Sequence, residues 1–220
     1  MDDTPFNSLK SETSDVVSPD AEAERWREYY ELRKQAPPRP TLLDALARFD
    51  SDPAPTVSRF ALDLGCGDGP DTAELLRRGW SVLAMDAQPE AIRRLRERSD
   101  IPAGTELETH VVGFESMTLR PATLINASYS LPFCAKAVFP SLWEQIVTSL
   151  VPGGRFCGQL FGDHDEWAGG GRTLHYTQAE AKALLSSLII EKFEEEERDG
   201  TVADGSPKHW HAFHIVARKG

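Results

Sequence analysis

Apolar residues recur along this chain in two alternating patterns. Short and nearly continuous apolar runs, bounded by glycine, proline or polar residues, are typical of buried strands, whereas apolar residues three or four positions apart indicate helices. The runs predict seven strands, at 60–64, 80–85, 107–112, 123–127, 155–161, 188–193 and 212–217. The helical spacing predicts helices between them, at 71–78, 89–98, 139–150 and 177–187, and two before the first strand, from 21 to the proline run at 36–40 and at 41–49.

The order of these elements predicts the fold class. Strands that alternate with helices form parallel βαβ units with right-handed crossovers. The last two strands have no helix between them, so we expect them to pair antiparallel at one edge. We therefore predict an α/β protein, a three-layer sandwich around a seven-stranded, mostly parallel, Rossmann-like sheet with the last strand antiparallel. Residues 151–154 are expected to form a turn, and 194–197 a solvated acidic stretch near a hairpin at 199–200.

The length and the N-terminal composition predict one domain with a tail. The 220 residues, 40% hydrophobic and 27% charged, fit a single globular domain. Residues 1–20 are rich in Asp, Ser, Thr and Pro without apolar periodicity, which indicates a disordered acidic tail. Residues 21–220 then form the domain, with an N-terminal helical cap at 21–50. Neither a membrane-span pattern nor a secretory leader is seen, which favours a cytoplasmic protein that does not bind membranes.

Charge and cysteine usage narrow the classes of partner. Twenty-four Lys and Arg against thirty-five Asp and Glu give a formal net charge of −11. Because nucleic acids are bound through a basic face, we expect no nucleic-acid partner. We expect the chain to act as a monomer or homodimer on a small-molecule substrate. Three widely spaced cysteines fit neither a disulfide framework nor a CxxC metal clip, so we predict buried thiols at Cys66, Cys134 and Cys157.

A glycine-rich loop follows the first predicted strand and holds three alternating glycines: Gly65, Gly67 and Gly69. Such a loop lets the backbone approach a ligand, and the helix that follows adds oriented amides. The spacing is G-x-G-x-G rather than the G-x-G-x-x-G of dinucleotide sites, and Asp63 and Asp68 would repel a pyrophosphate. The loop therefore favours a cofactor that carries a cationic amine. Asp86, at the end of the second strand, is placed to accept hydrogen bonds from ribose hydroxyls.

These motifs resemble those of the class I S-adenosylmethionine-dependent methyltransferases. The segment 61–69, Ala-Leu-Asp-Leu-Gly-Cys-Gly-Asp-Gly, is similar to their first motif, and Asp86 follows at the family's distance. The segment 151–156, Val-Pro-Gly-Gly-Arg-Phe, resembles their turn into the fifth strand. The motifs cover about residues 55–160, and the layout with a helical cap resembles the tellurite-resistance and related small-molecule methyltransferases. The resemblance implies S-adenosylmethionine as the cofactor and methyl transfer as the reaction.

The resemblance also implies roles for individual residues. The methionine part of the cofactor would lie on Asp63, Gly65, Cys66, Gly67 and Gly69. The ribose would bind Asp86 beside Ala87, the adenine would lie between Phe114 and Glu115, and Asn126 would lie beneath the sulfonium. A helix before the first strand closes over the cofactor in many such enzymes, which gives Tyr29, Tyr30 and Arg33 that covering role, with Arg33 (or Arg39) at the cofactor carboxylate. An aromatic face that only packs on the domain is the alternative.

Candidate substrate residues follow the fourth and fifth strands. Asn126 leads through Ala127 and Ser128 to Tyr129, a departure from the Asn-Pro-Pro-Tyr motif of enzymes that methylate nucleic-acid bases or glutamine. Tyr129 is expected in the substrate pocket. In open α/β sheets ligands bind beyond the carboxyl ends of strands, so Asp165 and Trp167 are further candidates.

His164 is a candidate general base, or else an exposed loop histidine. Lys208 and His209 are candidates for contact with an anionic substrate, or else edge-strand residues that serve packing alone. Alternate residues of a strand share a face, which sets His209 and His211 on one side of the last strand and Trp210 and His214 on the other. We predict no metal site, because no ligand pair stands on a helix face.

The sequence does not identify the methyl acceptor, and four chemical classes fit: a thiol, a chalcogen oxyanion, a carboxylate or a natural-product hydroxyl. Two other functions stay open, a protein side-chain methyltransferase and a non-catalytic S-adenosylmethionine-binding module. A nicotinamide oxidoreductase is disfavoured by the glycine spacing.

Overall fold

The computed structural model describes residues 19–32, 36–52 and 59–220. Most of the predicted tail, and Arg33, therefore lie outside the described residues. A helix already begins at Pro19, two residues before the expected boundary at 21. No helix in the described part of the chain combines the length and the apolar character needed to cross a membrane.

The sheet confirms the predicted fold class. Its strands are β1 (Phe60–Leu64), β2 (Ser81–Asp86), β3 (Leu107–Val111), β4 (Ala122–Ala127), β5 (Leu150–Gly162), β6 (His175–Tyr176), β7 (Ile189–Thr201) and β8 (Pro207–Arg218). Seven of them run in the order β3-β2-β1-β4-β5-β8-β7, and the two-residue β6, which has no counterpart in the sequence prediction, pairs with β5. Only β8 is antiparallel to its neighbours β5 and β7, as predicted for the last strand.

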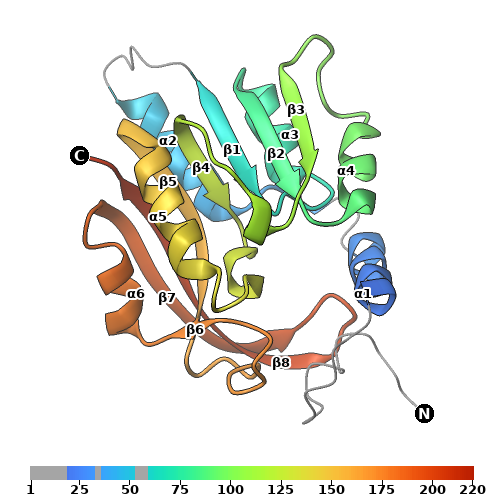
Figure 1. Cartoon of the computed structure of the whole chain (residues 1–220), viewed down its shortest axis with the longest axis vertical. Coiled ribbons are helices and arrows are strands. Elements are labelled where there is room, and N and C mark those ends of the chain that lie inside the picture. Colours follow the sequence, from blue (N-terminus) through green and yellow to red (C-terminus); the bar gives the residue numbers. More distant parts are fainter. Residues whose placement is uncertain (1–18, 33–35, 53–58) are drawn as a thin grey trace.

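Helices cover both faces of the sheet, which gives the three layers seen in Figure 1. They are α1 (Pro19–Leu32), α2 (Pro40–Ser51), α3 (Pro70–Arg77), α4 (Pro89–Arg96), α5 (Phe139–Ser149) and α6 (Gln178–Leu184). One hydrophobic core joins the sheet to α5 and α6, and a second joins it to α2, α3 and α4. Successive strand residues point to opposite faces, so Ala61 enters the second core while Leu62 and Leu64 enter the first.

The C-terminal hairpin is longer than the hydrophobic pattern predicts. The acidic residues 194–197 were expected in a solvated stretch, but they lie inside β7, and the chain turns at 202–206 instead of 199–200. The register pairs this acidic run with the histidine-rich β8, where Glu195 contacts His211 and Glu196 contacts His214, both at 2.9 Å. Cross-strand pairs of this kind stabilise a strand without an apolar face, and apolar periodicity does not register them.

The Val-Pro-Gly-Gly segment is also part of a strand rather than a separate turn. Residues 151–154 belong to β5, where the register with β4 shifts between Ala122 and Leu124. Gly153 has φ of 77° and its N–H donates to the carbonyl of Lys219 at 2.9 Å. The segment is thus an irregular start of β5 that is held by the C-terminus.

All three cysteines are free and buried, as predicted. Cys157 lies fully buried on β5 and Cys66 lies in the glycine loop. Burial raises the pKa of both thiols, which keeps them neutral.

Candidate active site

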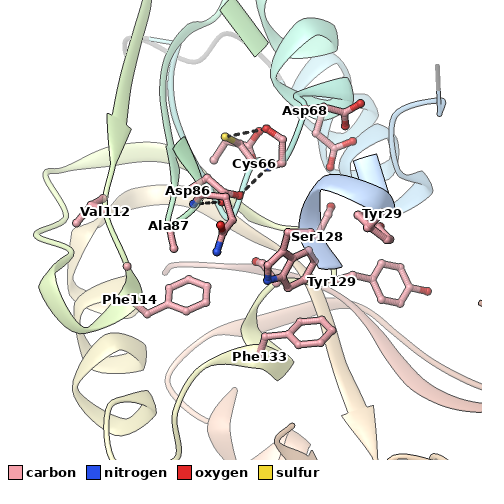
Figure 2. Close-up of a pocket in the computed structure, with 18 of the residues that line it drawn as sticks. Tyr29, Cys66, Asp68, Asp86, Ala87, Val112, Phe114, Ser128, Tyr129 and Phe133 are labelled. Carbon is pink, nitrogen blue, oxygen red and sulfur yellow. Dashed lines mark hydrogen bonds between the residues drawn. The ribbon is translucent and has the colours of Figure 1, made fainter. Parts of the chain in front are cut away.

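A cavity of about 510 Å³ opens beyond the carboxyl ends of the parallel strands. Figure 2 shows Ala87 and Phe114 toward one end, and Tyr29, Tyr129 and Phe133 toward the other, beside α1. The volume lies within the range of small-molecule and cofactor sites. The site therefore lies where the topology of an open α/β sheet places ligands.

The glycine loop forms the polar wall of this cavity. The N–H groups of Gly65 and Cys66 both donate to the carbonyl of Met85, at 2.8 and 3.0 Å, which ties the loop to the end of β2. Gly65 has φ of 69°, and a Cβ at this position would come within 2.4 Å of the Ser130 side chain. Only glycine fits this turn, so the loop follows directly from the sequence.

Asp86 is held in the wall by two backbone amides. Its carboxylate oxygens accept from the N–H of Gly67 at 2.9 Å and from the N–H of Gln88 at 2.8 Å. The side chain is buried, and burial raises the pKa of Asp86 above its ordinary value. Each oxygen has a second lone pair, so the carboxylate is able to accept further hydrogen bonds from a ligand.

Behind this wall, Asn126 links two further carboxylates. Its amide Nδ2 donates to Asp63 at 2.9 Å and to Asp71 at 3.0 Å, and Thr72 donates to Asp63 at 2.5 Å. Burial, followed by the nearby Asp71 carboxylate, raises the pKa of Asp63. Asp63 lines the cavity, whereas Asn126 is completely buried and does not. In this structure Asn126 positions the carboxylates rather than facing the cavity.

Helix α1 closes the cavity from outside with aromatic side chains. Tyr30 is only 3% exposed, and a Cβ on Gly67 would lie 3.4 Å from its ring. Burial and the Asp86 carboxylate raise the pKa of Tyr30, so its hydroxyl stays protonated. Trp26 stacks on Tyr30 with 6.3 Å between ring centroids and also lines the cavity. The expected contribution of α1 to the site thus rests on Tyr30 and Trp26.

Arg39 is the only cation among the described residues that line the cavity. Its backbone N–H donates to Asp71 at 2.7 Å, and its guanidinium lies 4.7 Å from the centroid of the Tyr129 ring. The arginine that lines the cavity is therefore Arg39, which the sequence analysis gave as the alternative to Arg33.

Tyr129 follows β4 in an unusual backbone conformation. Its φ is 53°, the only positive value among the described non-glycine residues. Its N–H donates to Gln159 on β5 at 2.9 Å, and Gln159 in turn donates to Thr41 at 2.7 Å. Strained backbone that is held in this way is common at functional sites. The sequence did not indicate Gln159, because a lone glutamine in an apolar strand carries no motif.

Phe114 and Glu115 line the cavity after β3, together with Val112. Gly67, Cys66, Asp68 and Ala87 are further lining residues. Gly69 does not line the cavity. It is the N-cap residue of α3, with a left-handed backbone conformation at φ of 84°. Trp26 and Phe133 line it as well but were not candidates, because isolated aromatics are indistinguishable from core residues in a sequence.

The remaining candidates do not line the cavity. Asp165 is buried in an ion pair with Lys208 at 2.5 Å, and the Lys208 ammonium lies over the rings of Phe161, Trp167 and Trp210. His164 is exposed beside His211, and His209 is exposed beside Asp199. The two faces of β8 explain this separation, because Trp210 and His214 contact Tyr129 whereas His209 and His211 point the other way.

Comparisons with known proteins find a family match for part of the chain and a shared fold. Residues 61–154, somewhat less than half of the chain, match the family described as "Methyltransferase domain". No curated protein matches the sequence significantly. The described cavity contains the glycine loop and Asp86 of this matched segment.

Solved structures share the fold over most of the chain. TehB from Haemophilus influenzae superposes with a TM-score of 0.71 at 17% identity, over 89% of this chain and 67% of that chain. A TehB-like S-adenosylmethionine-dependent methyltransferase from Corynebacterium glutamicum has a TM-score of 0.59 at 21% identity, over 91% and 97% of the chains. The 1,6-didemethyltoxoflavin-N1-methyltransferase of Burkholderia thailandensis, with bound 1,6-didemethyltoxoflavin and S-adenosylhomocysteine, has a TM-score of 0.59 at 19% identity, over 90% and 86%.

The family match and the shared fold point in the same direction, because residues 61–154 match a methyltransferase domain and the fold is that of solved S-adenosylmethionine-dependent methyltransferases. The fold is shared with TehB over 89% of this chain.

Proposed function

We propose that the protein transfers the methyl group of S-adenosylmethionine to a small-molecule acceptor bound at the aromatic end of the cavity. The observation that carries this proposal is the division of one cavity into two ends. Asp86, the glycine loop and Asp63 line the cavity with polar and acidic groups, whereas Tyr29, Tyr129 and Phe133, which lie toward one end in Figure 2, line it with aromatic rings.

The acidic end suits the cofactor. We assign the ribose hydroxyls to Asp86 beside Ala87, and the adenine to Phe114 and Glu115. The methionine part would lie along Gly65, Cys66 and Gly67, with its ammonium group toward Asp63 and its carboxylate toward Arg39. A guanidinium–carboxylate contact is strong and directional, and Arg39 is the one cation available among the described lining residues.

The aromatic end suits the acceptor. Rings bury a large area of an apolar or planar molecule and orient it. Among the acceptor classes named above, a natural-product hydroxyl carried on such a molecule uses these rings most fully. In the transfer the acceptor oxygen forms a bond to the methyl carbon while the carbon–sulfur bond breaks, the bonding pair stays on sulfur, and the hydroxyl proton is released to water. The sulfonium is already reactive, so the protein contributes mainly orientation of the two reactants.

The closed shape of the site favours a small molecule over a protein side chain. Helix α1 covers the glycine loop with Tyr30 and Trp26, and the cavity has the size of a ligand site rather than an extended groove. An acceptor that leaves Tyr30 in place therefore has to fit within the cavity.

Isothermal titration with S-adenosylhomocysteine, with NADH as the comparison ligand, is the first test. We expect micromolar binding of S-adenosylhomocysteine and none of NADH, followed by acceptor-dependent formation of S-adenosylhomocysteine in a screen of small molecules. Binding without turnover on any small acceptor, but with turnover on a protein lysate, would overturn the proposed substrate class. A matched control for both assays is Asp86→Ala, which should lose binding and turnover together.

A further inference from the structure

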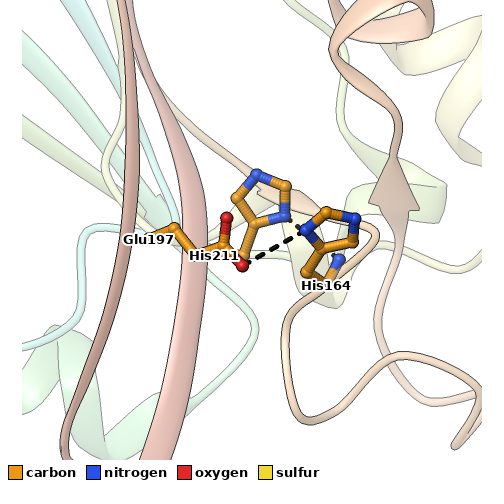
Figure 3. A group of neighbouring side chains, drawn as sticks. All are labelled: His164, Glu197 and His211. Atoms are coloured by element: carbon orange, nitrogen blue, oxygen red, sulfur yellow. Dashed lines mark hydrogen bonds and ion pairs between the residues drawn. The ribbon is translucent and has the colours of Figure 1, made fainter.

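A second group of chemically capable side chains lies outside the cavity, where the loop after β5 meets the β7–β8 hairpin. His164 from the loop, Glu197 from β7 and His211 from β8 each offer one ligand atom, and these atoms all lie within 4.8 Å of one another. Figure 3 shows the two imidazole rings and the carboxylate facing a common point. None of the three lines the cavity.

The distances within this cluster are close to those of a coordination site. Nδ1 of His164 lies 3.2 Å from Oε1 of Glu197, and the rings of His164 and His211 have their centroids 4.9 Å apart. Nδ1 of His211 accepts the backbone N–H of His164 at 3.0 Å. A cation at the common point would take over this lone pair, and water would then satisfy the amide of the exposed His164.

Neighbouring carboxylates orient the histidines for such a role. Nε2 of His211 lies 2.9 Å from Glu195, which favours the tautomer with the proton on Nε2. Nδ1 is then the acceptor nitrogen, and its lone pair is the one that the ion would take over from the His164 amide. His209 repeats the arrangement, because its Nδ1 lies 2.8 Å from Asp199 while its Nε2 lies 3.3 Å from Glu197. Carboxylates behind metal-binding histidines orient the rings and raise their basicity.

The backbone that carries these side chains is fixed on both sides. The N–H of Glu166 donates to the carbonyl of His209, and the N–H of His209 donates to the Glu166 side chain, both at 3.0 Å. The buried ion pair between Asp165 and Lys208 joins the same loop to β8. The loop and the hairpin therefore hold the ligand positions together, while His164 and Glu197 stay exposed and open to an ion from solvent.

We propose that His164, Glu197 and His211 bind a divalent transition-metal ion, in particular Zn²⁺, with His209 or water as the fourth donor. Two imidazole nitrogens and one carboxylate oxygen suit Zn²⁺, whereas Ca²⁺ and Mg²⁺ prefer sites built from oxygen alone. The ion would fasten the loop after β5 to the hairpin. Because it binds the folded chain, it would also raise the thermal stability.

The test uses the full chain without a histidine tag, freed of metal with a chelator. Calorimetric titration with ZnCl₂ should give one binding event per chain, and Zn²⁺ should raise the melting temperature. His164→Ala and Glu197→Gln alter exposed side chains, and each should weaken binding at least tenfold. The matched control is His110→Ala, because His110 forms an exposed pair with Glu108 at 3.0 Å on β3, far along the sheet from the hairpin.

Three results would overturn the proposal: no saturable Zn²⁺ binding by the wild-type chain, equal affinity in wild type and both cluster variants, or an equal loss in the control. Circular dichroism of the metal-free variants verifies that they fold. Equal affinity throughout would locate the ion on other residues.

Discussion

At the scale of single residues, two buried carboxylates set the chemistry of the polar end of the cavity. Asp86 is held by the amides of Gly67 and Gln88, and Asp63 by Asn126 and Thr72. Burial raises the pKa of each, so each loses its charge at a higher pH than an ordinary aspartate. Their proposed partners differ, because Asp86 would meet neutral hydroxyls and Asp63 a cationic amine.

Asp86→Ala should weaken the binding of S-adenosylhomocysteine at least tenfold. Hydrogen bonds to a charged acceptor contribute about 1.5–3 kcal/mol, and about 1.4 kcal/mol corresponds to tenfold in affinity. Calorimetry measures the change, and Glu144→Gln, at an exposed position on α5, is the matched control. Unchanged affinity in Asp86→Ala would remove this residue from the site.

As the pH is lowered, cofactor affinity should begin to fall at a higher pH than protonation of an ordinary aspartate would cause. As the pH drops through the raised pKa of Asp63, the carboxylate takes up a proton and no longer attracts the ligand ammonium. A single linked proton changes affinity by up to about tenfold per pH unit. In Asp63→Asn the residual dependence should be only that of Asp86. An identical pH profile in this variant and in the wild type would contradict the assignment of Asp63.

At the scale of secondary-structure elements, α1 is the part of the site that does not belong to the sheet. It contacts α4, and Glu31 forms an ion pair with Arg94 at 2.5 Å. Its Tyr30 covers the glycine loop. The element therefore behaves as a cover whose aromatic side chains complete a cavity built by the strand ends.

Tyr30→Ala should speed the dissociation of S-adenosylhomocysteine several-fold, because the ring shields the ligand side of Gly67 from solvent. Tyr30→Phe keeps the ring and should behave like the wild type. Stopped-flow fluorescence measures the dissociation rates of both variants. If Tyr30→Phe lost as much as Tyr30→Ala, the hydroxyl near Asp86 rather than the cover would be the important group.

At the scale of the whole molecule, one sheet organises two separate sites. The cavity lies at the carboxyl ends of β1, β2 and β4, and the histidine cluster lies where the loop after β5 meets the β7–β8 hairpin. Arg155 helps to hold the sheet at its antiparallel side, because its buried guanidinium donates to Glu191 at 2.7 and 3.0 Å. The two sites share no described residue, so each is open to testing without the other.

Removal of residues 1–18 should leave both the melting temperature and the affinity for S-adenosylhomocysteine unchanged. The prediction rests on the low-hydrophobicity composition of this segment and on the start of α1 at Pro19. Calorimetry and thermal unfolding of the shortened chain measure both quantities. A melting temperature lower by several degrees would show that the segment packs on the domain.

The sequence by itself determined the fold class, the glycine loop and the acid at the end of β2. These features depend on neighbours within a few residues: apolar periodicity, backbone that only Gly65 tolerates, and the spacing from loop to strand end. It did not determine the long hairpin, because cross-strand pairs such as Glu195 with His211 leave no apolar period. Tertiary structure alone decided that Arg39, Phe133 and Trp26 meet in the cavity, because segments far apart in sequence have to pack together to form it. It also decided that His164 lies beside His211, because this contact requires β5 to pair with β8 in one register and alternate side chains of β8 to point to opposite faces.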